Sequence, residues 1–333
     1  MQELHRGGPL HRDHIRATVI RLLTNLHQAA SEANDLRLAG DGLLPPHTRE
    51  VSPPGPHAGS PPRLLDIQLH ELATRYVSSQ LRLPAGWELI VAGEEATFQQ
   101  TNRLAQARGP ALIILIDALD GTSSYMTMGA GYGAAFVAFA RLPGSSLDLP
   151  LGAGIIDSSG IGLIDFPDHH MMLDNATITP QLFSAKHPDH LGAISGLSAQ
   201  TGHITAVVNL SAGRAAARFD RVYRALSDAF DTDVELINIG AGTAAAVAMA
   251  TREVDIAIRG RKLMTAYDAA GTWLLIRAGA TVSGFDDPSA WSSRVFSDLM
   301  TQRITHMSAP IPRHIIARTP TLHGNLFNAL PHT

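Results

Sequence analysis

The segment Leu112–Tyr125 constrains the fold more than any other part of the sequence. It starts with five consecutive leucine and isoleucine residues, a run typical of a strand that is buried on both faces. The run ends in two carboxylates three residues apart, Asp117 and Asp120, and continues through Gly121 into three hydroxyl residues. Such a strand end can gather cations and a phosphate. Asp-Gly after a strand is also a common hairpin signal, so partner carboxylates elsewhere must decide.

Composition bounds the remaining possibilities. The chain has 333 residues, enough for two domains or one large layered unit, with 45% hydrophobic and 17% charged residues. The net charge of −4 gives no general attraction to nucleic acid or to anionic membranes. Without cysteine, any metal must be held by oxygen or histidine. We find neither a signal peptide nor a run of the ~18 apolar residues that a membrane span needs, so we expect a cytoplasmic protein.

The first half of the chain, residues 1–176, is predicted to be α+β with an antiparallel tendency. Apolar residues at helical spacing and short apolar runs between turns are the basis for this prediction. Helices are expected at residues 13–32 and 64–81, and strands at 87–91, 112–116, 133–141, 152–156 and 160–166. Residues 44–63 contain seven prolines and predict a surface loop or a disordered insertion.

The second half, residues 177–333, alternates strands with helices. This alternation predicts an α/β layer with a mostly parallel sheet. Strands are expected at residues 205–210, 234–239, 254–258 and 280–283, and helices at 218–230, 243–250 and 267–278. We find no internal repeat.

Two further acids occupy positions like those of the first pair. Glu94 follows the strand predicted at 87–91, and Asp268 lies at the start of a helix rich in small residues. Asp268 alone could simply be a helix N-cap. Four acids at strand ends and a helix start, together with a backbone carbonyl, suit a cluster of two or three Mg²⁺ ions. Such a cluster predicts hydrolysis of a phosphate ester.

Three blocks together carry a family resemblance. Residues 93–95, 117–122 and 267–271 resemble, in order and approximate spacing, the blocks of the inositol monophosphatase family of magnesium-dependent, lithium-sensitive sugar phosphatases. The resemblance runs from about Asp66 to the C-terminus. It implies a layered α/β/α/β/α sandwich, a homodimer, a small phosphorylated metabolite as substrate, and Mg²⁺ as cofactor, with Mn²⁺ able to substitute.

The resemblance also implies roles for individual residues. The metal ligands would be Glu94, Asp117, the carbonyl of Leu119, Asp120 and Asp268. The catalytic residues would be Glu94, Thr122 and Asp117, with Thr122 and Glu94 activating the attacking water. The N–H groups of Gly121 and Thr122 would hold the phosphate, and the substrate would contact Asp120, Gly242, Thr243, Ala244 and Arg261. Asp66 matches an acid near the weakest metal site.

Some positions depart from the family pattern. Ala118 stands where the family usually has proline, Ser123 and Ser124 replace Thr-Asn, and Tyr267 replaces a common tryptophan. Arg261, seven residues before Asp268, replaces a glutamate that accepts hydrogen bonds from ring hydroxyls. This resembles the branch that hydrolyses both inositol monophosphate and fructose 1,6-bisphosphate. We therefore hypothesise a substrate with a second phosphate or a carboxylate; a solvated basic turn is the alternative.

Other functions remain open at this point. Within the enzyme class, 3′-phosphoadenosine 5′-phosphate and histidinol phosphate are alternative substrates, although the first branch usually has lysine where this chain has Ser123. A catalytically silent relative that binds a sugar phosphate is an alternative of another class. The segment Val234–Ala244, with glycines at 240 and 242, also has the outline of a dinucleotide-binding turn, and Arg259 could favour a 2′-phosphate.

Overall fold

The computed structural model describes residues 12–39, 64–93, 109–142, 148–166, 180–187, 192–194, 196–198, 202–209, 215–230, 232–259, 267–285, 287–304 and 311–329. Seven strands form the first sheet: β1 (Glu88–Gly93), β2 (Ala111–Asp120), β3 (Gly133–Arg141), β4 (Leu149–Asp157), β5 (Ile161–Asp165), β6 (Gln181–Ser184) and β7 (Gly192–Ala193). Five form the second: β8 (His203–Asn209), β9 (Asp233–Asn238), β10 (Ile256–Arg259), β11 (Thr281–Gly284) and β12 (His314–Ala317). The helices are α2 (Arg12–Ala39), α3 (Leu64–Gln80), α5 (Thr122–Met128), α7 (Ala215–Ala229), α8 (Gly242–Ala250), α9 (Ala270–Arg277), α10 (Ser293–Ile304) and α11 (Pro320–Ala329), with a 3₁₀ turn η2 (Tyr267–Ala269) before α9.

The first sheet has its strands in chain order. Strand β1 runs parallel to β2, and every later neighbour pair is antiparallel, which confirms the antiparallel tendency predicted for this half. All ten residues of β2 are buried. Alternate residues of this strand face opposite layers: Ile113 and Leu115 belong to one apolar cluster, Ile114 and Ile116 to another. Because both faces are covered, the strand needs apolar residues at every position, which is the pattern in the sequence.

The second sheet has the strand order β11-β12-β10-β8-β9. Strand β8 pairs in parallel with β9 and with β10, whereas β12 is antiparallel to both β10 and β11. The prediction of a mostly parallel sheet was therefore wrong for the β11–β12 side. The reason is β12: this four-residue strand inserts between β10 and β11, and its sequence pattern is too short to be recognised.

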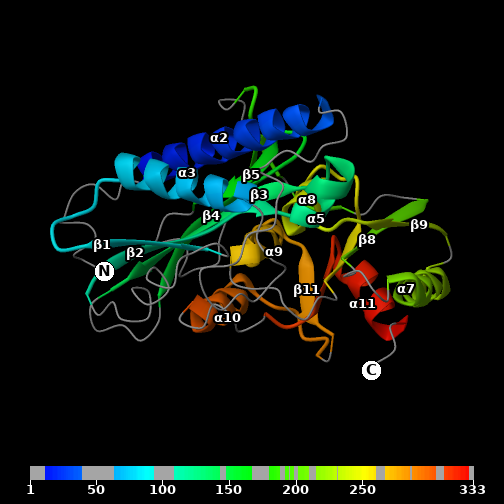
Figure 1. Ribbon diagram of the computed structural model, residues 1–333. Helices are drawn as coiled ribbons and strands as arrows, with labels where there is room; N and C mark the ends of the chain where they lie inside the picture. The colour runs from blue at the N-terminus through cyan, green and yellow to red at the C-terminus, as the bar shows by residue number, and fades with distance from the viewer. Residues whose placement is uncertain are drawn as a thin grey trace.

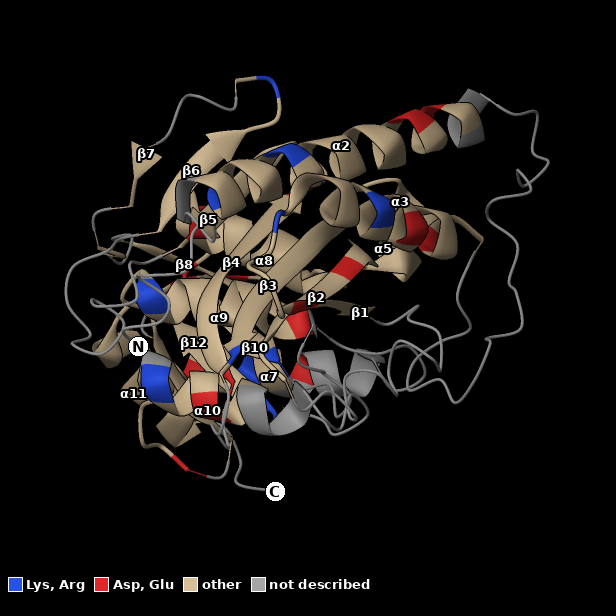
Figure 2. Cartoon of the chain, turned by 90° about the vertical axis from the view of Figure 1, so that its left-hand side faces the viewer, with Lys and Arg blue, Asp and Glu red and all other residues tan. Residues whose placement is uncertain are grey.

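The elements stack as a layered α/β/α/β/α sandwich, as expected. Helices α2 and α3 lie side by side over one face of the first sheet, and α8 and α9 lie between the two sheets (Figure 1). Helices α7 and α11 cover the outer face of the second sheet. In Figure 2 the long strands of the first sheet carry hardly any charged residues along their length. The chain is thus an α+β protein in which the middle helices contact both sheets.

Other details refine the sequence-based expectations. The hydroxyl-rich stretch after Gly121 forms the short helix α5 rather than only a turn, and the helix expected at 267–278 begins as the 3₁₀ turn η2. The expected division at 176/177 and the proline-rich stretch 44–63 lie outside the described residues, while the first sheet extends to β7. Of the helices in the described ranges, none combines the length and apolar character that crossing a bilayer requires.

Candidate active site

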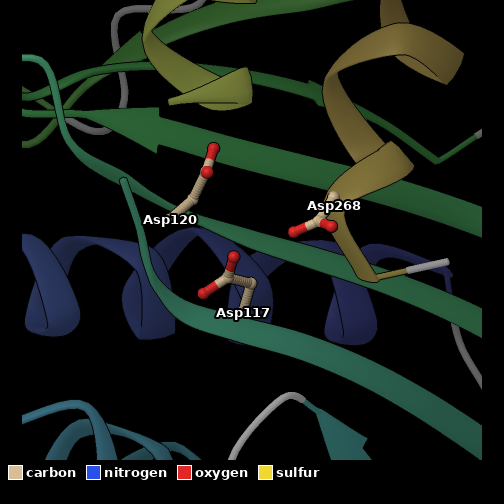
Figure 3. A group of neighbouring side chains, drawn as sticks. All are labelled: Asp117, Asp120 and Asp268. Carbon is tan, nitrogen blue, oxygen red and sulfur yellow. The ribbon is translucent and has the colours of Figure 1, made fainter. Parts of the chain in front are cut away.

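Three carboxylates from distant parts of the sequence meet at one point. Asp117 and Asp120 lie at the end of β2, and Asp268 lies in η2, just before α9. One ligand oxygen from each lies within 4.8 Å of the others. Figure 3 shows the Asp268 carboxylate directed toward the two acids of the strand. Asp117 and Asp120 are buried and Asp268 is half-buried, so the three charges lie close together in a partly dehydrated space.

A β-bulge places both acids of β2 on the same face. Residues three apart in a regular strand point to opposite faces, since side chains alternate with a period of two. Here the pairing with β3 shifts between Asp117, which pairs with Ala135, and Asp120, which pairs with Gly133. One residue thus lies between the two partners on β3, whereas two residues lie between the acids on β2. The Asp117 Oδ1 atom accepts a hydrogen bond from the Leu119 amide at 3.1 Å, which stabilises the bulge.

Asp120 also contacts the start of α8. Its Oδ2 atom accepts a 2.7 Å hydrogen bond from the amide of Thr243, the second residue of the helix. Ala241, the N-cap residue of α8, makes no side-chain hydrogen bond to the helix. Asp120 thus supplies the cap from another element, and its negative charge faces the positive end of the helix dipole. The amide that a dinucleotide pyrophosphate would need is therefore engaged by a carboxylate, which argues against the dinucleotide-binding interpretation.

Thr122 connects the strand end to helix α3. Its hydroxyl oxygen lies 3.1 Å from Asp66 Oδ1 and 3.2 Å from the Leu119 carbonyl oxygen, both of which are acceptors. The hydroxyl has one proton and can donate it to only one of the two at a time. Asp66 is buried at 3% exposure in the first turn of α3. The fold therefore brings Asp66 next to the hydroxyl that the family resemblance assigns to water activation.

Gly121 allows the strand end and the start of α8 to approach each other. Its φ is +86°, in the left-handed region that favours glycine. A Cβ built on Gly121 would lie 2.6 Å from the Cβ of Ala241. A side chain at this position would push the Asp120 end of β2 away from α8. The glycine in the Asp-Gly pair is thus required by packing as well as by backbone conformation.

Arg259 and His314 lie deep beside the acidic cluster, at paired positions of β10 and β12. The Arg259 guanidinium donates a 2.7 Å hydrogen bond to the Gly242 carbonyl. Burial lowers the pKa of Arg259 from its ordinary value, while the charges of Asp120 and Asp268 act to raise it. Burial and, to a smaller extent, the Arg259 charge lower the pKa of His314 to about 4 against the raising effect of its hydrogen bond with the Pro312 carbonyl, so His314 is neutral at pH 7. Arg259 is only 5% exposed, whereas Arg261, for which a solvated basic turn was the alternative, lies outside the described residues.

His70, like His314, is a buried histidine near the site that the sequence analysis did not identify. It lies four residues after Asp66, one turn along α3, and is 3% exposed. A Cβ built on Gly93 would lie 2.9 Å from the Cε1 atom of His70, and among the described residues neither ring nitrogen has a hydrogen-bond partner. Burial lowers its pKa to about 4. The i, i+4 spacing with Asp66 was a usable signal, because both side chains lie on the same helix face.

Two of the candidate site residues, Glu94 and Arg261, lie outside the described residues, so their placement stays a prediction. The remaining candidates all belong to the region around α8 and the end of β2. Gly242, Thr243 and Ala244 form the first turn of α8, and Thr243 is 2% exposed. The Thr243 hydroxyl has no hydrogen-bond partner among the described residues, and it faces the interior rather than an open surface.

The donor set fits a hard divalent cation. Three carboxylates whose oxygens lie within 4.8 Å of one another offer only oxygen ligands, the type that Mg²⁺, Ca²⁺ and Mn²⁺ prefer. Three like charges at this separation repel one another strongly unless a cation lies between them or beside them. The residues present therefore suit a metal ion, and the Leu119 carbonyl lies next to the same bulge.

Comparisons with known proteins support the architecture. The sequence matches no family model and has no significant match among curated proteins. Among solved structures, SuhB of Mycobacterium tuberculosis has a TM-score of 0.53 at 14% identity, covering 97% of both chains. The extragenic suppressor protein SuhB of Bartonella henselae has a TM-score of 0.59 at 10% identity, covering 95% of this chain and 98% of that one. Inositol monophosphatase II of Staphylococcus aureus has a TM-score of 0.51 at 10% identity, covering 95% and 92%. The chain shares the fold of these proteins.

Proposed function

We propose that this protein is a phosphoric monoester hydrolase of the inositol monophosphatase family that requires Mg²⁺. The convergence of Asp117, Asp120 and Asp268 within 4.8 Å, at the positions of the family's sequence blocks, is the observation that carries the proposal. The fold shared with SuhB and with an inositol monophosphatase is a second line of support for the proposal. The sequence by itself matches no family model, so this support comes from the three-dimensional structure.

The three aspartates would hold the metal together with Glu94 and the Leu119 carbonyl. A bound divalent ion would supply charge neutralisation for the phosphate and the leaving oxygen, and would lower the pKa of a coordinated water. The bulge in β2 makes this arrangement physically reasonable, since it turns Asp117, Asp120 and the peptide between them toward the same side. Two or three ions, with Mn²⁺ able to replace Mg²⁺, are what the family resemblance implies.

Thr122 would orient the attacking water. Its hydroxyl lies within hydrogen-bond distance of Asp66 and of the Leu119 carbonyl. Since the Leu119 carbonyl would serve as a metal ligand, the Thr122 hydroxyl would donate its proton to Asp66. The lone pairs of the Thr122 oxygen are then directed away from Asp66 and can accept a hydrogen bond from water. Glu94 would take the proton of that water, and the amides of Gly121 and Thr122 would hold the phosphate.

The substrate is proposed to be a small phosphate monoester, either an inositol monophosphate or a sugar bisphosphate such as fructose 1,6-bisphosphate. Asp120 and the first turn of α8, residues 242–244, would contact its hydroxyls. Arg261 would contact a second phosphate or a carboxylate, because a guanidinium donates to anions where a glutamate would accept from hydroxyls. Arg261→Glu is expected to reduce turnover of a bisphosphate more than that of a monophosphate. Equal effects on both would remove Arg261 from substrate recognition.

The deciding experiment is phosphate release from a panel of esters, with and without Mg²⁺ and Li⁺. The panel contains inositol 1-phosphate, fructose 1,6-bisphosphate, histidinol phosphate and 3′-phosphoadenosine 5′-phosphate. We expect Mg²⁺-dependent release from at least one ester. The Asp117→Asn variant should abolish it, and Thr122→Ser should retain more of it than Thr122→Val. Binding of an ester without turnover would instead support a silent sugar-phosphate-binding protein.

Dimerisation and a cytoplasmic location also remain predictions. Sedimentation of the purified protein would test the first, and fractionation of cells the second.

A further inference from the structure

Arg259 is a buried cation inside the acidic site. It is the last residue of β10 and is 5% exposed. A Cβ built on Gly242 would lie 3.3 Å from Asp120 Oδ2 and 3.5 Å from Arg259 Nη2, with the Asp268 carbonyl oxygen at 3.6 Å. The guanidinium, a metal-site carboxylate and the backbone of η2 therefore surround one point at the start of α8.

Hydrogen bonds with neutral partners do not account for the placement of this charge. The guanidinium donates to the Gly242 carbonyl at 2.7 Å, but its Nε atom has no hydrogen-bond partner among the described residues. A guanidinium taken out of water at this depth needs compensating negative charge. Asp120 and Asp268 are the charges that act on Arg259, each favouring its protonated form.

We propose that Arg259 is a fixed, built-in cation of the acidic site. It neutralises part of the charge of Asp120 and Asp268, holds both carboxylates and the start of α8 together without metal, and weakens the binding of the divalent ion that these two acids share. This inference rests on the proposed metal-dependent function and adds a regulator of metal affinity to it. Arg259 acts through the aspartates and is a positioning residue, not a group that touches the reacting atoms.

The proposal predicts a specific relation between charge and metal affinity. The guanidinium repels a divalent ion that is bound a few ångströms away in a partly dehydrated site. Removing its charge should therefore tighten Mn²⁺ binding by about ten-fold or more. The same removal should lower the melting temperature of the metal-free protein, because the acids lose their counter-charge, and should enlarge the rise in melting temperature that Mn²⁺ produces.

The test compares Arg259→Met and Arg259→Lys in the full chain. Mn²⁺ is titrated and its free concentration followed by electron paramagnetic resonance, and melting temperatures are measured with and without Mn²⁺. We expect tighter binding in Arg259→Met and wild-type affinity in Arg259→Lys, which keeps the charge. If Arg259→Met does not fold, Arg259→Gln gives the same comparison. Arg277→Met is the matched control: this buried arginine pairs with Asp165 at 2.8 Å, at the other end of α9 from Asp268, and its loss should leave Mn²⁺ affinity unchanged.

The outcomes separate the two proposals. If the wild type binds Mn²⁺ in a way that Asp268→Asn abolishes, the metal site is supported, and the Arg259 variants then decide the inference. Neutral variants that bind no more tightly than wild type, or a lysine variant that gains as much as the methionine variant, would overturn it. A wild-type chain that binds no Mn²⁺, or whose binding is insensitive to Asp268→Asn, would overturn the proposed function and the role of Arg259 with it.

Discussion

Replacing Gly121 by alanine should destabilise the protein by two separable effects. The first is conformational, because an alanine at φ +86° costs about 1–2 kcal/mol. The second is steric: the new Cβ would lie 2.6 Å from the Ala241 Cβ and 3.1 Å from the Gly131 carbonyl oxygen. Overpacking of this kind costs about 1–3 kcal/mol. We therefore expect a total loss of about 2–5 kcal/mol in the free energy of unfolding.

Two matched variants separate these effects. Gly86 has a φ of +82° and open space around it, so Gly86→Ala should show the conformational cost alone. Adding Ala241→Gly to Gly121→Ala removes the Cβ–Cβ contact and should restore part of the steric cost of about 1–3 kcal/mol, since the Gly131 carbonyl oxygen stays 3.1 Å from the new Cβ. Urea unfolding of the metal-free wild type and the three variants measures these differences. The reasoning is wrong if Gly121→Ala costs no more than Gly86→Ala, or if the second substitution restores nothing.

Two further predictions follow from the charges of the site. Asp268→Asn should abolish the rise in melting temperature that Mn²⁺ produces, since it removes one of the three carboxylates that would hold the ion; thermal melts in which the rise persisted would contradict this. His70 and His314 have folded-state pKa values of about 4 against an ordinary 6.5, so the unfolded chain binds more protons between these values. The free energy of unfolding should thus be highest above pH 6.5 and should fall toward pH 4, by about 3 kcal/mol per histidine at the lower end. Urea unfolding across this pH range measures the loss, and His314→Gln should reduce its slope. A stability that does not change with pH would contradict the pKa assignment.

The sequence was most informative where one physical requirement dominated. The run from Leu112 to Ile116 is apolar at every position because both of its faces are buried, and this made β2 recognisable. Acids at the ends of strands and at a helix start were recognisable for the same reason, since they interrupt apolar patterns. The layered architecture was expected from the family resemblance, and the two sheets β1–β7 and β8–β12 confirm that architecture.

The structural details that bring the acids together could not be predicted from the sequence. Ala118 and Leu119 are apolar like the residues of the preceding strand, so nothing in the sequence indicates the bulge that turns Asp120 to the same face as Asp117. The cap that Asp120 provides to α8 joins residues 123 positions apart, which no local pattern can reveal. No local pattern indicated that Arg259 is buried, because the tendency of basic residues toward solvent is a local rule. The burial of Arg259 depends on two carboxylates from other elements.

The position of α8 and η2 between the two sheets has a consequence for biosynthesis. Asp117 and Asp120 leave the ribosome long before Asp268, and the middle layer closes only after strands from both halves are available to cover it. A divalent ion that needs all three carboxylates can therefore bind only to the nearly complete tertiary structure, never to a nascent N-terminal half. At an ion concentration about 100 times its dissociation constant, such late binding would add about 2.7 kcal/mol to the stability of the finished protein. The supply of metal during expression should then influence how much folded protein accumulates without altering how early strands assemble.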